Sequence, residues 1–220
     1  QPVRLMVALP ALDEAATIAQ VVTAIPREIP GVSEILILVV DDGSTDDTGI
    51  LAEQAGAVVI RHVRCTGVGA AFRTALNHAL EQDIDILLTI DSDGQFDPGD
   101  IPELAQPVIS GECDFSSASR FKDPSLMPKM PWIKRWGNRQ MSRLISRLTQ
   151  QQFYDVSCGM RCYNRRAMLN LNLMGAYTYT QEVFLNLAFK RLRIIEAPIS
   201  VRGVREHGKS RVVSSVGGYG

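Results

Sequence analysis

Short hydrophobic runs alternate with amphipathic stretches along the first ninety residues of the chain. The runs are rich in β-branched residues, which is typical of strands buried on both faces. They span residues 3–9, 35–40, 57–61 and 84–90. Between them, the spacing of apolar residues predicts helices over residues 14–24, 48–55 and 70–81. This alternation predicts an α/β fold in which a parallel sheet carries helices on both faces.

The second half of the chain is less regular, but the same patterns predict further elements. Helices are expected over residues 98–109, 132–150, 165–171 and 181–190. Strands are expected over residues 114–119, 159–163 and 193–201. The sequence contains no internal repeat and no low-complexity region, so residues 1–220 are expected to form a single domain.

Acidic residues follow three of the four strands predicted in the first half. They are Asp13 and Glu14, Asp41 and Asp42, and Asp91 and Asp93. The carboxyl ends of parallel strands meet at one edge of a sheet, which is where such folds bind ligands. The turn after the first strand, "LPALDEA", has no glycine, and there is no GxxxxGK[ST] motif. These absences argue against a dinucleotide site of the Rossmann type and against a P-loop.

Asp91 and Asp93 stand immediately after the apolar run from Ile86 to Ile90. In an extended strand both carboxylates would point the same way, and they would repel each other unless a cation lay between them. Gln95 adds a third oxygen two residues later. Hard divalent cations such as Mg²⁺ and Mn²⁺ prefer carboxylate and amide oxygens, so this stretch is a candidate metal site. A turn or a helix cap would explain the same bare pattern.

Charge is distributed unevenly along the chain. The formal net charge of −1 gives no indication of a nucleic-acid partner. Between Arg120 and Arg147, however, there are eight basic residues and one acidic residue. Residues 120–150 also contain two tryptophans and an apolar stripe at helical spacing, a combination that suits a membrane surface. The alternatives are a solvated helix face and a stripe that packs on the core.

The four cysteines have no metal-binding spacing, which favours reduced thiols and a cytosolic protein. No apolar run approaches the roughly 20 residues that span a bilayer. We therefore expect a cytoplasmic protein that is peripheral at the inner face of the membrane, with or without a tether from segments outside this chain.

Eight motifs occur in order along nearly the whole chain. They read "LPALDEAATI", "VVDDGSTDDT", "RCTGVGAAFRTAL", "TIDSDGQFDP", "SSASRF", "DVSCGMRCYNRRAM", "YTQEVF" and "VREHGKSR". Together they resemble the family 2 glycosyltransferases of GT-A fold, and within that family the dolichyl-phosphate mannose synthases and other polyprenyl-phosphate sugar transferases. The resemblance implies a Rossmann-like three-layer sandwich with a mostly parallel sheet. It also implies a UDP- or GDP-linked sugar donor, Mg²⁺ or Mn²⁺, inversion at the anomeric carbon and a lipid-phosphate acceptor.

The resemblance also implies roles for individual positions. Residues 1–95 would form the nucleotide-sugar-binding half, and residues 96–220 the acceptor-binding half. The donor site would contain Pro10, Ala11, Leu12, Glu14, Asp41, Gly43, Asp91 and Ser92. The metal ligands would be Asp91, Asp93 and Gln95, and the catalytic set Asp91, Asp93, Arg120, Glu182, Arg205 and Lys209. The candidates for contact with the acceptor phosphate are Arg120, Arg135, Arg139 and Arg161, with a core salt bridge as the alternative for Arg161.

The chemistry of the acceptor decides whether a catalytic base is needed. A lipid monophosphate, with a second pKa of about 6, is already a dianion near neutral pH and needs positive charge to hold it. A sugar hydroxyl would instead need a carboxylate base, for which Asp155 and Glu182 are the candidates. A further alternative is a domain that binds a nucleotide sugar without catalysis, although the intact pair of aspartates speaks against it.

Overall fold

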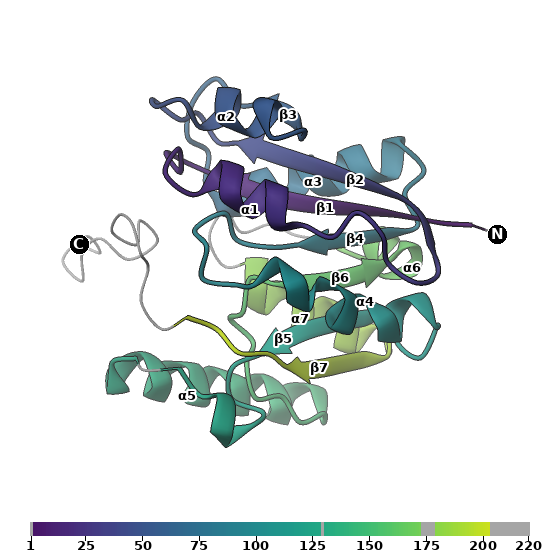
Figure 1. Ribbon diagram of the computed structural model, residues 1–220. Helices are drawn as coiled ribbons and strands as arrows, with labels where there is room; N and C mark the ends of the chain where they lie inside the picture. The colour runs from purple at the N-terminus through teal and green to yellow at the C-terminus, as the bar shows by residue number, and fades with distance from the viewer. Residues whose placement is uncertain (1, 129, 173–178, 203–220) are drawn as a thin grey trace.

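The computed structural model describes residues 2–128, 130–172 and 179–202. Its centre is a sheet of seven strands in the order β3-β2-β1-β4-β6-β5-β7 (Figure 1). The strands are β1 (Val3–Ala11), β2 (Val32–Asp41), β3 (Val58–Arg61), β4 (Ile86–Thr89), β5 (Phe115–Ser119), β6 (Arg161–Asn164) and β7 (Ile194–Pro198). All neighbouring strands are parallel except β6, which is antiparallel to both β4 and β5. The predicted α/β class with a mostly parallel sheet is therefore confirmed.

Helices cover both faces of the sheet and give the molecule three layers (Figure 1). The α-helices are α1 (Ile18–Ala24), α2 (Thr48–Gln54), α3 (Val68–Glu81), α4 (Ile101–Ile109), α5 (Trp132–Thr149), α6 (Arg165–Leu169) and α7 (Tyr179–Phe189), and the short 3-10 helices are η1 (Pro98–Asp100) and η2 (Pro124–Leu126). One hydrophobic cluster packs α1, α2 and α4 on the sheet, and a second packs α3, α5, α6 and α7. In β1, Leu5, Val7 and Leu9 join the first cluster. Met6 and Ala8 join the second, which explains why the hydrophobic run is continuous.

The predicted elements are all present, and the differences lie at their ends. The first helix begins at Ile18 rather than near residue 14, because residues 12–17 form bends and turns in which Asp13 has a φ of 50°. β4 ends at Thr89, one residue earlier than predicted. The last strand ends at Pro198, which cannot donate a backbone hydrogen bond to a continuing ladder.

The reversed direction of β6 brings a second segment of chain to the carboxyl edge of the sheet. Arg161, the first residue of β6, pairs with Thr89 at the end of β4 and with Ser117 in β5. The residues that precede β6, 153–160, therefore lie beside the ends of β4 and β5. The sequence predicted this strand but not its direction.

Asp42 organises the turn between β3 and α3. Its buried carboxylate accepts hydrogen bonds from Thr66 N at 3.0 Å and Gly67 N at 2.8 Å, and it pairs with His62 Nδ1 at 2.7 Å. Burial alone would raise the pKa of this carboxyl, but the hydrogen bonds from Thr66, His62 and Gly67 hold it below its ordinary value of 3.8. Asp42 thus holds this turn in place.

Helix α5 is attached to the rest of the molecule by a narrow contact. Ser142 and Ile145 are its only buried side chains. Ile145 belongs to the same hydrophobic cluster as Phe153 and Phe184, and α5 packs against α7. Among the described residues, no helix has both the length and the apolar character that a membrane crossing requires.

The contact made by α5 predicts that substitutions at Ile145 and at Leu144 change the free energy of unfolding by very different amounts. Ile145→Ala should lower the free energy of unfolding by about 3 kcal/mol, because it opens a cavity in the second cluster. Leu144→Ala should change it by less than about 0.5 kcal/mol, because Leu144 is 51% exposed. Urea unfolding of the two variants and the wild type measures both effects, and equal losses would show that α5 is packed differently.

The hydrogen bonds of Asp42 predict a pH-dependent loss of stability. Asp42→Asn should lower the free energy of unfolding by about 2 kcal/mol at neutral pH, since an amide can accept on one oxygen only. The folded pKa is depressed, so the advantage of the carboxylate is present above pH 3.8 and is lost as the pH falls further. Urea unfolding should therefore find a gap between wild type and variant that narrows in acid. The control is Asp47→Asn, at an exposed position whose side chain makes no capping hydrogen bond; a gap of the same size there would contradict the prediction.

Candidate active site

The loops that follow β1, β2 and β4 are hydrogen-bonded to one another at the carboxyl edge of the sheet. Asp42 N donates to Ala11 O at 2.8 Å, and Asp13 N donates to Ser44 Oγ at 2.9 Å. Ser92 Oγ donates to Pro10 O at 2.8 Å. The predicted donor-site positions lie at the ends of β1 and β2 and in these connected loops. Pro10, Ala11 and Asp41 are the strand residues, and Leu12, Glu14, Gly43, Asp91 and Ser92 lie in the loops.

Asp41 is the buried acid of the loop after β2. Its Oδ1 accepts a hydrogen bond from Ser44 N at 2.8 Å, and its Oδ2 lies 3.4 Å from Arg61 Nε. Oδ2 is buried and accepts no hydrogen bond within the described part of the chain. Gly43 has a φ of 81°, and a Cβ there would lie 2.6 Å from the carbonyl carbon of Arg64. The turn therefore requires glycine, and the ion pair with Arg61 is the contact of Asp41 Oδ2 in the described part of the chain.

Asp91 and Asp93 lie in a turn rather than in an extended strand. β4 ends at Thr89, and residues 92–94 form a turn and a bend. Our argument that strand geometry makes the two carboxylates point the same way is therefore wrong. Asp93 is 6% exposed, and its Oδ1 accepts a hydrogen bond from Gln95 N at 3.0 Å. Gln95 Nε2 donates to Arg202 O at 3.1 Å, which orients the amide of the third predicted ligand.

Gly159 lies against the carboxylate of Asp91. A Cβ at this position would lie 2.5 Å from both carboxylate oxygens of Asp91, which is closer than real atoms approach. The glycine comes from the segment that enters the reversed strand β6. Any side chain there would displace the Asp91 carboxylate, so the two segments are matched in shape. The sequence motif "SCGM" contains this glycine, but the motif alone did not identify its contact.

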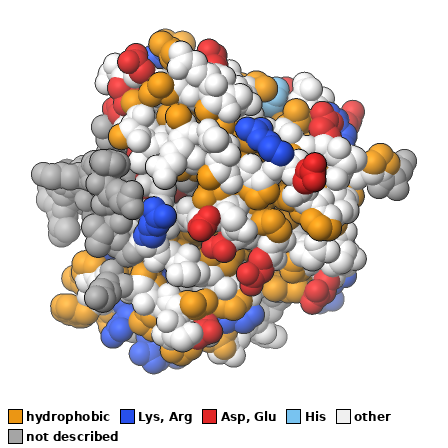
Figure 2. All heavy atoms as spheres, in the orientation of Figure 1, with side chains coloured by type: hydrophobic (Ala, Val, Ile, Leu, Met, Phe, Trp, Pro, Cys, Tyr) orange, Lys and Arg blue, Asp and Glu red, His pale blue; other side chains and the backbone are white. Residues whose placement is uncertain are grey.

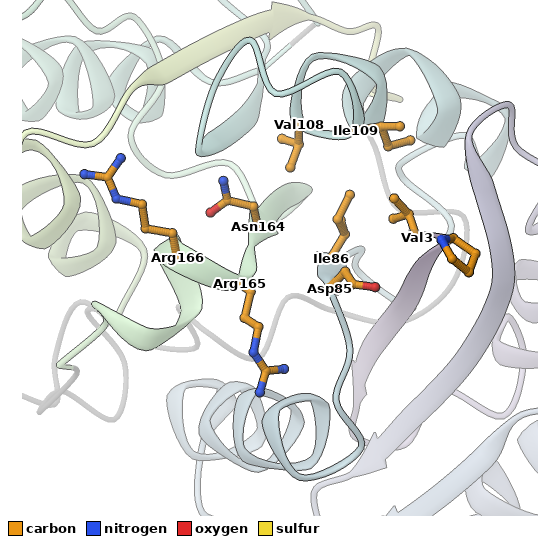
Figure 3. A pocket seen from close by; sticks show the side chains of 9 residues that line it. Val3, Asp85, Ile86, Val108, Ile109, Asn164, Arg165 and Arg166 are labelled. Atoms are coloured by element: carbon orange, nitrogen blue, oxygen red, sulfur yellow. The ribbon is translucent and has the colours of Figure 1, made fainter.

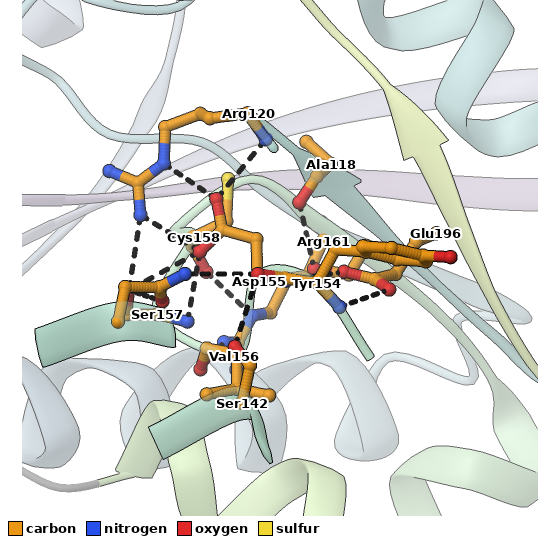
Figure 4. Close-up of polar contacts among 12 residues, drawn as sticks. Ala118, Arg120, Ser142, Tyr154, Asp155, Val156, Ser157, Cys158, Arg161 and Glu196 are labelled. Atoms are coloured by element: carbon orange, nitrogen blue, oxygen red, sulfur yellow. Dashed lines mark hydrogen bonds and ion pairs between the residues drawn. The ribbon is translucent and has the colours of Figure 1, made fainter. Parts of the chain in front are cut away.

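Arg120, at the end of β5, forms a two-point ion pair with Asp155 (Figure 4). Arg120 Nε lies 2.6 Å from Asp155 Oδ2, and Nη2 lies 2.9 Å from Oδ1. Burial alone would lower the pKa of the guanidinium, but the hydrogen bonds and the charge of Asp155 raise it above its ordinary value, and the charge of Asp91 contributes in the same direction. Arg120 is therefore a permanent cation in the neighbourhood of the aspartate pair.

The pairing with Arg120 changes the interpretation of Asp155. As a candidate base it would need an accessible oxygen, but the residue is fully buried and both oxygens accept hydrogen bonds from Arg120. The structure therefore contradicts a base role for Asp155. The two residues are 35 positions apart, and no sequence pattern indicated that they pair.

Arg161 is a core residue, which contradicts its predicted contact with the acceptor phosphate. It is fully buried, and its guanidinium donates to Cys158 O at 2.7 Å, Thr180 O at 2.9 Å and Val156 O at 3.1 Å. It also lies over the ring of Phe184. The arginine satisfies three backbone carbonyls in the core, so its role is structural.

The remaining predicted residues lie on α5, on α7 or outside the described residues. Arg135 and Arg139 are exposed on α5, where Arg135 Nη1 contacts Met127 Sδ at 3.5 Å. Glu182 is half-buried in the first turn of α7, where a carboxylate also favours the helix. Arg205 and Lys209 lie outside the residues that the structure describes.

A cavity of about 310 Å³ lies at the opposite edge of the sheet (Figure 3). It is lined by the amino ends of β1 and β4, with Val3 and Ile86, and by the start of α6. Its two arginines already have acidic partners, since Arg165 pairs with Asp83 and Arg166 with Asp114. This cavity contains none of the predicted site residues.

The donor atoms at the carboxyl edge fit a hard divalent cation. No group of three or more His, Cys, Asp or Glu side chains that could hold a metal is found in the described part of the chain. Mg²⁺ and Mn²⁺ commonly use one or two carboxylates and leave their other positions to water and phosphate oxygens. Asp91 and Asp93, with the amide of Gln95, therefore fit a cation that is shared with a diphosphate, and they do not form a closed structural site.

Two curated relatives cover most of the chain. UDP-N-acetylglucosamine–dolichyl-phosphate N-acetylglucosaminyltransferase of Methanococcus voltae is 30% identical over 183 residues, which is 74% of this chain and 73% of the relative. Polyprenol monophosphomannose synthase of Mycolicibacterium smegmatis is 24% identical, and the alignment covers 96% of this chain and 82% of the relative.

Solved structures and family membership agree with this likeness. Glucosyl-3-phosphoglycerate synthase of Mycobacterium tuberculosis, in complex with Mn²⁺, uridine diphosphate and glucosyl-3-phosphoglycerate, matches with a TM-score of 0.72 at 25% identity, over 93% of this chain and 73% of that structure. Residues 6–171 match the model of the glycosyl transferase family 2. The chain therefore belongs to glycosyl transferase family 2 and is a glycosyltransferase with the GT-A fold.

Proposed function

We propose that this enzyme transfers a sugar from a nucleoside diphosphate donor to a polyprenyl monophosphate at the inner face of a membrane, with inversion at the anomeric carbon. The donor would lie along the connected loops after β1, β2 and β4. Asp41 Oδ2 would accept a hydrogen bond from the ribose or the base in exchange for its 3.4 Å ion pair with Arg61, whose side chain is 57% exposed. Uridine diphosphate and Mn²⁺ in the complex of glucosyl-3-phosphoglycerate synthase support a donor of this class.

Asp91 and Asp93 would hold Mg²⁺ or Mn²⁺ against the diphosphate, with Gln95 as a further ligand. When bound, the cation would act as a Lewis acid that neutralises negative charge on the departing nucleoside diphosphate. The chain's contribution is to fix the direction of the two carboxylates, through Gln95 N on Asp93 and through the backbone of Gly159 beneath Asp91. Arg205 and Lys209, outside the described residues, stay candidates for closing on the diphosphate.

The observation that carries the lipid-phosphate proposal is the exposed surface of α5. Large apolar side chains between 40% and 72% exposed occupy this helix: Trp132, Ile133, Trp136, Met141, Leu144 and Leu148. Exposed arginines recur every four residues beside them: Arg135, Arg139, Arg143 and Arg147. Figure 2 shows hydrophobic and basic side chains together at the lower end of the molecule, where Figure 1 draws α5. Such a helix suits an anionic bilayer surface, where each basic residue contributes about 1 kcal/mol.

The proposed reaction needs no catalytic base. A phosphate oxygen of the lipid attacks the anomeric carbon, and the bond from that carbon to the diphosphate oxygen breaks, so the nucleoside diphosphate leaves with the electron pair. A monophosphate is a dianion near neutral pH, since its second pKa is about 6, and has no proton to lose. It needs a fixed cation, for which we propose Arg120. In the described part of the chain its Nε and Nη2 donate to Asp155 and Ser157, so the phosphate would be held through Nη1.

Two other acceptors are the competing proposals. The M. tuberculosis structure has glucosyl-3-phosphoglycerate bound, which favours a small phosphorylated acceptor as the first alternative. A sugar hydroxyl is the second, and it would use Glu182 as the base, since Asp155 is fully buried. A small acceptor in water would leave the apolar surface of α5 without a use, and for this reason we favour the lipid. A binding domain without catalysis would leave the fitted aspartate turn unexplained.

The contact between Gly159 and Asp91 predicts the effect of a single methyl group on cation binding. Gly159→Ala should weaken Mn²⁺-dependent binding of uridine diphosphate by about tenfold or more, because the new Cβ displaces the Asp91 carboxylate. Isothermal titration calorimetry with and without Mn²⁺ measures this. The matched control is Gly137→Ala on α5, where a Cβ would have no neighbour within 4 Å. If Gly159→Ala and Asp93→Ala both bound uridine diphosphate with the same Mn²⁺ dependence as the wild type, the proposed cation site would be wrong.

The identity of the acceptor is tested by a panel of donors and acceptors. UDP-N-acetylglucosamine, UDP-glucose and GDP-mannose are each incubated with Mn²⁺ and either undecaprenyl phosphate in vesicles or 3-phosphoglycerate in solution. We expect a lipid-linked sugar and no soluble product. Product from 3-phosphoglycerate alone would replace the lipid proposal.

Two substitutions then separate a phosphate acceptor from a hydroxyl acceptor. Arg120→Lys keeps a positive charge for Asp155 but loses the forked geometry, and should lower transfer by about tenfold. Glu182→Gln removes the only remaining candidate base and should lower transfer much less. The opposite order of the two losses, measured as initial rates, would favour a hydroxyl acceptor.

A further inference from the structure

A chain of hydrogen bonds joins helix α5 to the guanidinium of Arg120. Arg120 Nη2 donates to Ser157 Oγ at 3.1 Å, and Ser157 Oγ donates to Asn138 Oδ1 on α5 at 2.7 Å. The hydroxyl also lies 3.3 Å from Asp155 Oδ1, but the bond to Asn138 is the shorter one. Figure 4 shows Ser157 between Arg120 and the helices below it. The orientation of Arg120 is therefore set from two sides, by Asp155 and by Ser157.

The segment that carries Asp155 and Ser157 is itself fixed by a buried acid on β7. Glu196 is 6% exposed, and its two carboxylate oxygens accept hydrogen bonds from Tyr154 N at 2.8 Å and Asp155 N at 2.7 Å. Burial raises the pKa of Glu196, while these two bonds act in the opposite direction. Because the backbone is held in this way, Ser157 cannot easily follow a movement of α5 on its own.

Helix α5 contacts the same segment at a second point. Asn138 Nδ2 and Ser142 Oγ both donate to Tyr154 O, at 3.0 and 3.1 Å. Only Asn138 also reaches Ser157. Asn138 and Ser142 are one turn apart on α5 and share the contact with Tyr154 O. They differ because only Asn138 is linked, through Ser157, to Arg120.

We propose that Asn138 and Ser157 are positioning residues that couple the place of α5 to the orientation of the Arg120 guanidinium toward the acceptor phosphate. This inference rests on the proposed function, because it takes the acceptor to be a phosphate held by Arg120. Helix α5, which would lie on the membrane, thereby also fixes the orientation of Arg120, which would bind the lipid phosphate.

The test uses citronellyl phosphate, a short isoprenoid phosphate, as the acceptor in solution. With the active donor from the panel and Mn²⁺, Asn138→Ala should raise the KM for citronellyl phosphate by about fivefold, the equivalent of one hydrogen bond, and change kcat little. Ser142→Ala, which removes only the contact with Tyr154 O, should leave both constants near the wild-type values. Ser157→Ala should resemble Asn138→Ala. The double variant should be no worse than either single variant, because all three lose the same link.

Sedimentation with phosphatidylcholine vesicles that contain phosphatidylglycerol distinguishes loss of the Asn138–Ser157 hydrogen bond from a displacement or unfolding of α5. Asn138→Ala should sediment as the wild type does. If it loses vesicle binding together with its KM, if the two single variants add, or if Ser142→Ala is equally impaired, the positioning role is overturned while the proposed function stands. If the wild-type enzyme transfers no sugar to citronellyl phosphate or to undecaprenyl phosphate, both proposals fall.

Discussion

The ion pair between Arg120 and Asp155 is the constraint on which the second half of the site depends. A fully buried carboxylate without a counter-charge would destabilise the fold by several kcal/mol, so Asp155 must keep Arg120 at the end of β5. The pair is also short and two-pointed, which fixes the plane of the guanidinium. Because Arg120 lies near Asp91, a requirement of stability places a permanent positive charge beside the candidate cation site.

The acids at this edge of the sheet divide into two groups. Asp42, Asp155 and Glu196 are buried and accept hydrogen bonds from the protein's own backbone and side chains, so they shape loops. Asp91 and Asp93 occupy a turn whose form is set by neighbours, the backbone of Gly159 and of Gln95. The first group gives the rigidity that the second group needs, since a cation site works only if its ligands are held in place.

Much of this architecture could be predicted from the sequence, because hydrophobic periodicity reports burial directly. Every β-strand and α-helix of the described residues was expected, and so was the gathering of acidic loops at one edge, but the short helix η2 was not. Several other features were not, among them the direction of β6 and the contact between Gly159 and Asp91. The extended backbone expected through Asp91 and Asp93 is absent, because β4 ends at Thr89. Arg161 was equally compatible with a core position and with a phosphate contact, and the sequence does not show the three backbone carbonyls to which it donates in the core. The partnership of Arg120 with Asp155 joins distant positions and leaves no local pattern.

The reversed strand β6 has a further consequence for how such an enzyme can diversify. β5 and β6 are adjacent and antiparallel, so everything between them, residues 120–160, is one long hairpin excursion that leaves and re-enters the sheet at neighbouring points. Helix α5 and its arginines belong to this excursion, whereas the β1, β2 and β4 loops do not. The two ends of the excursion, Arg120 and Gly159, lie against Asp155 and Asp91, so only its middle part, with α5, could change in length or composition without disturbing those contacts.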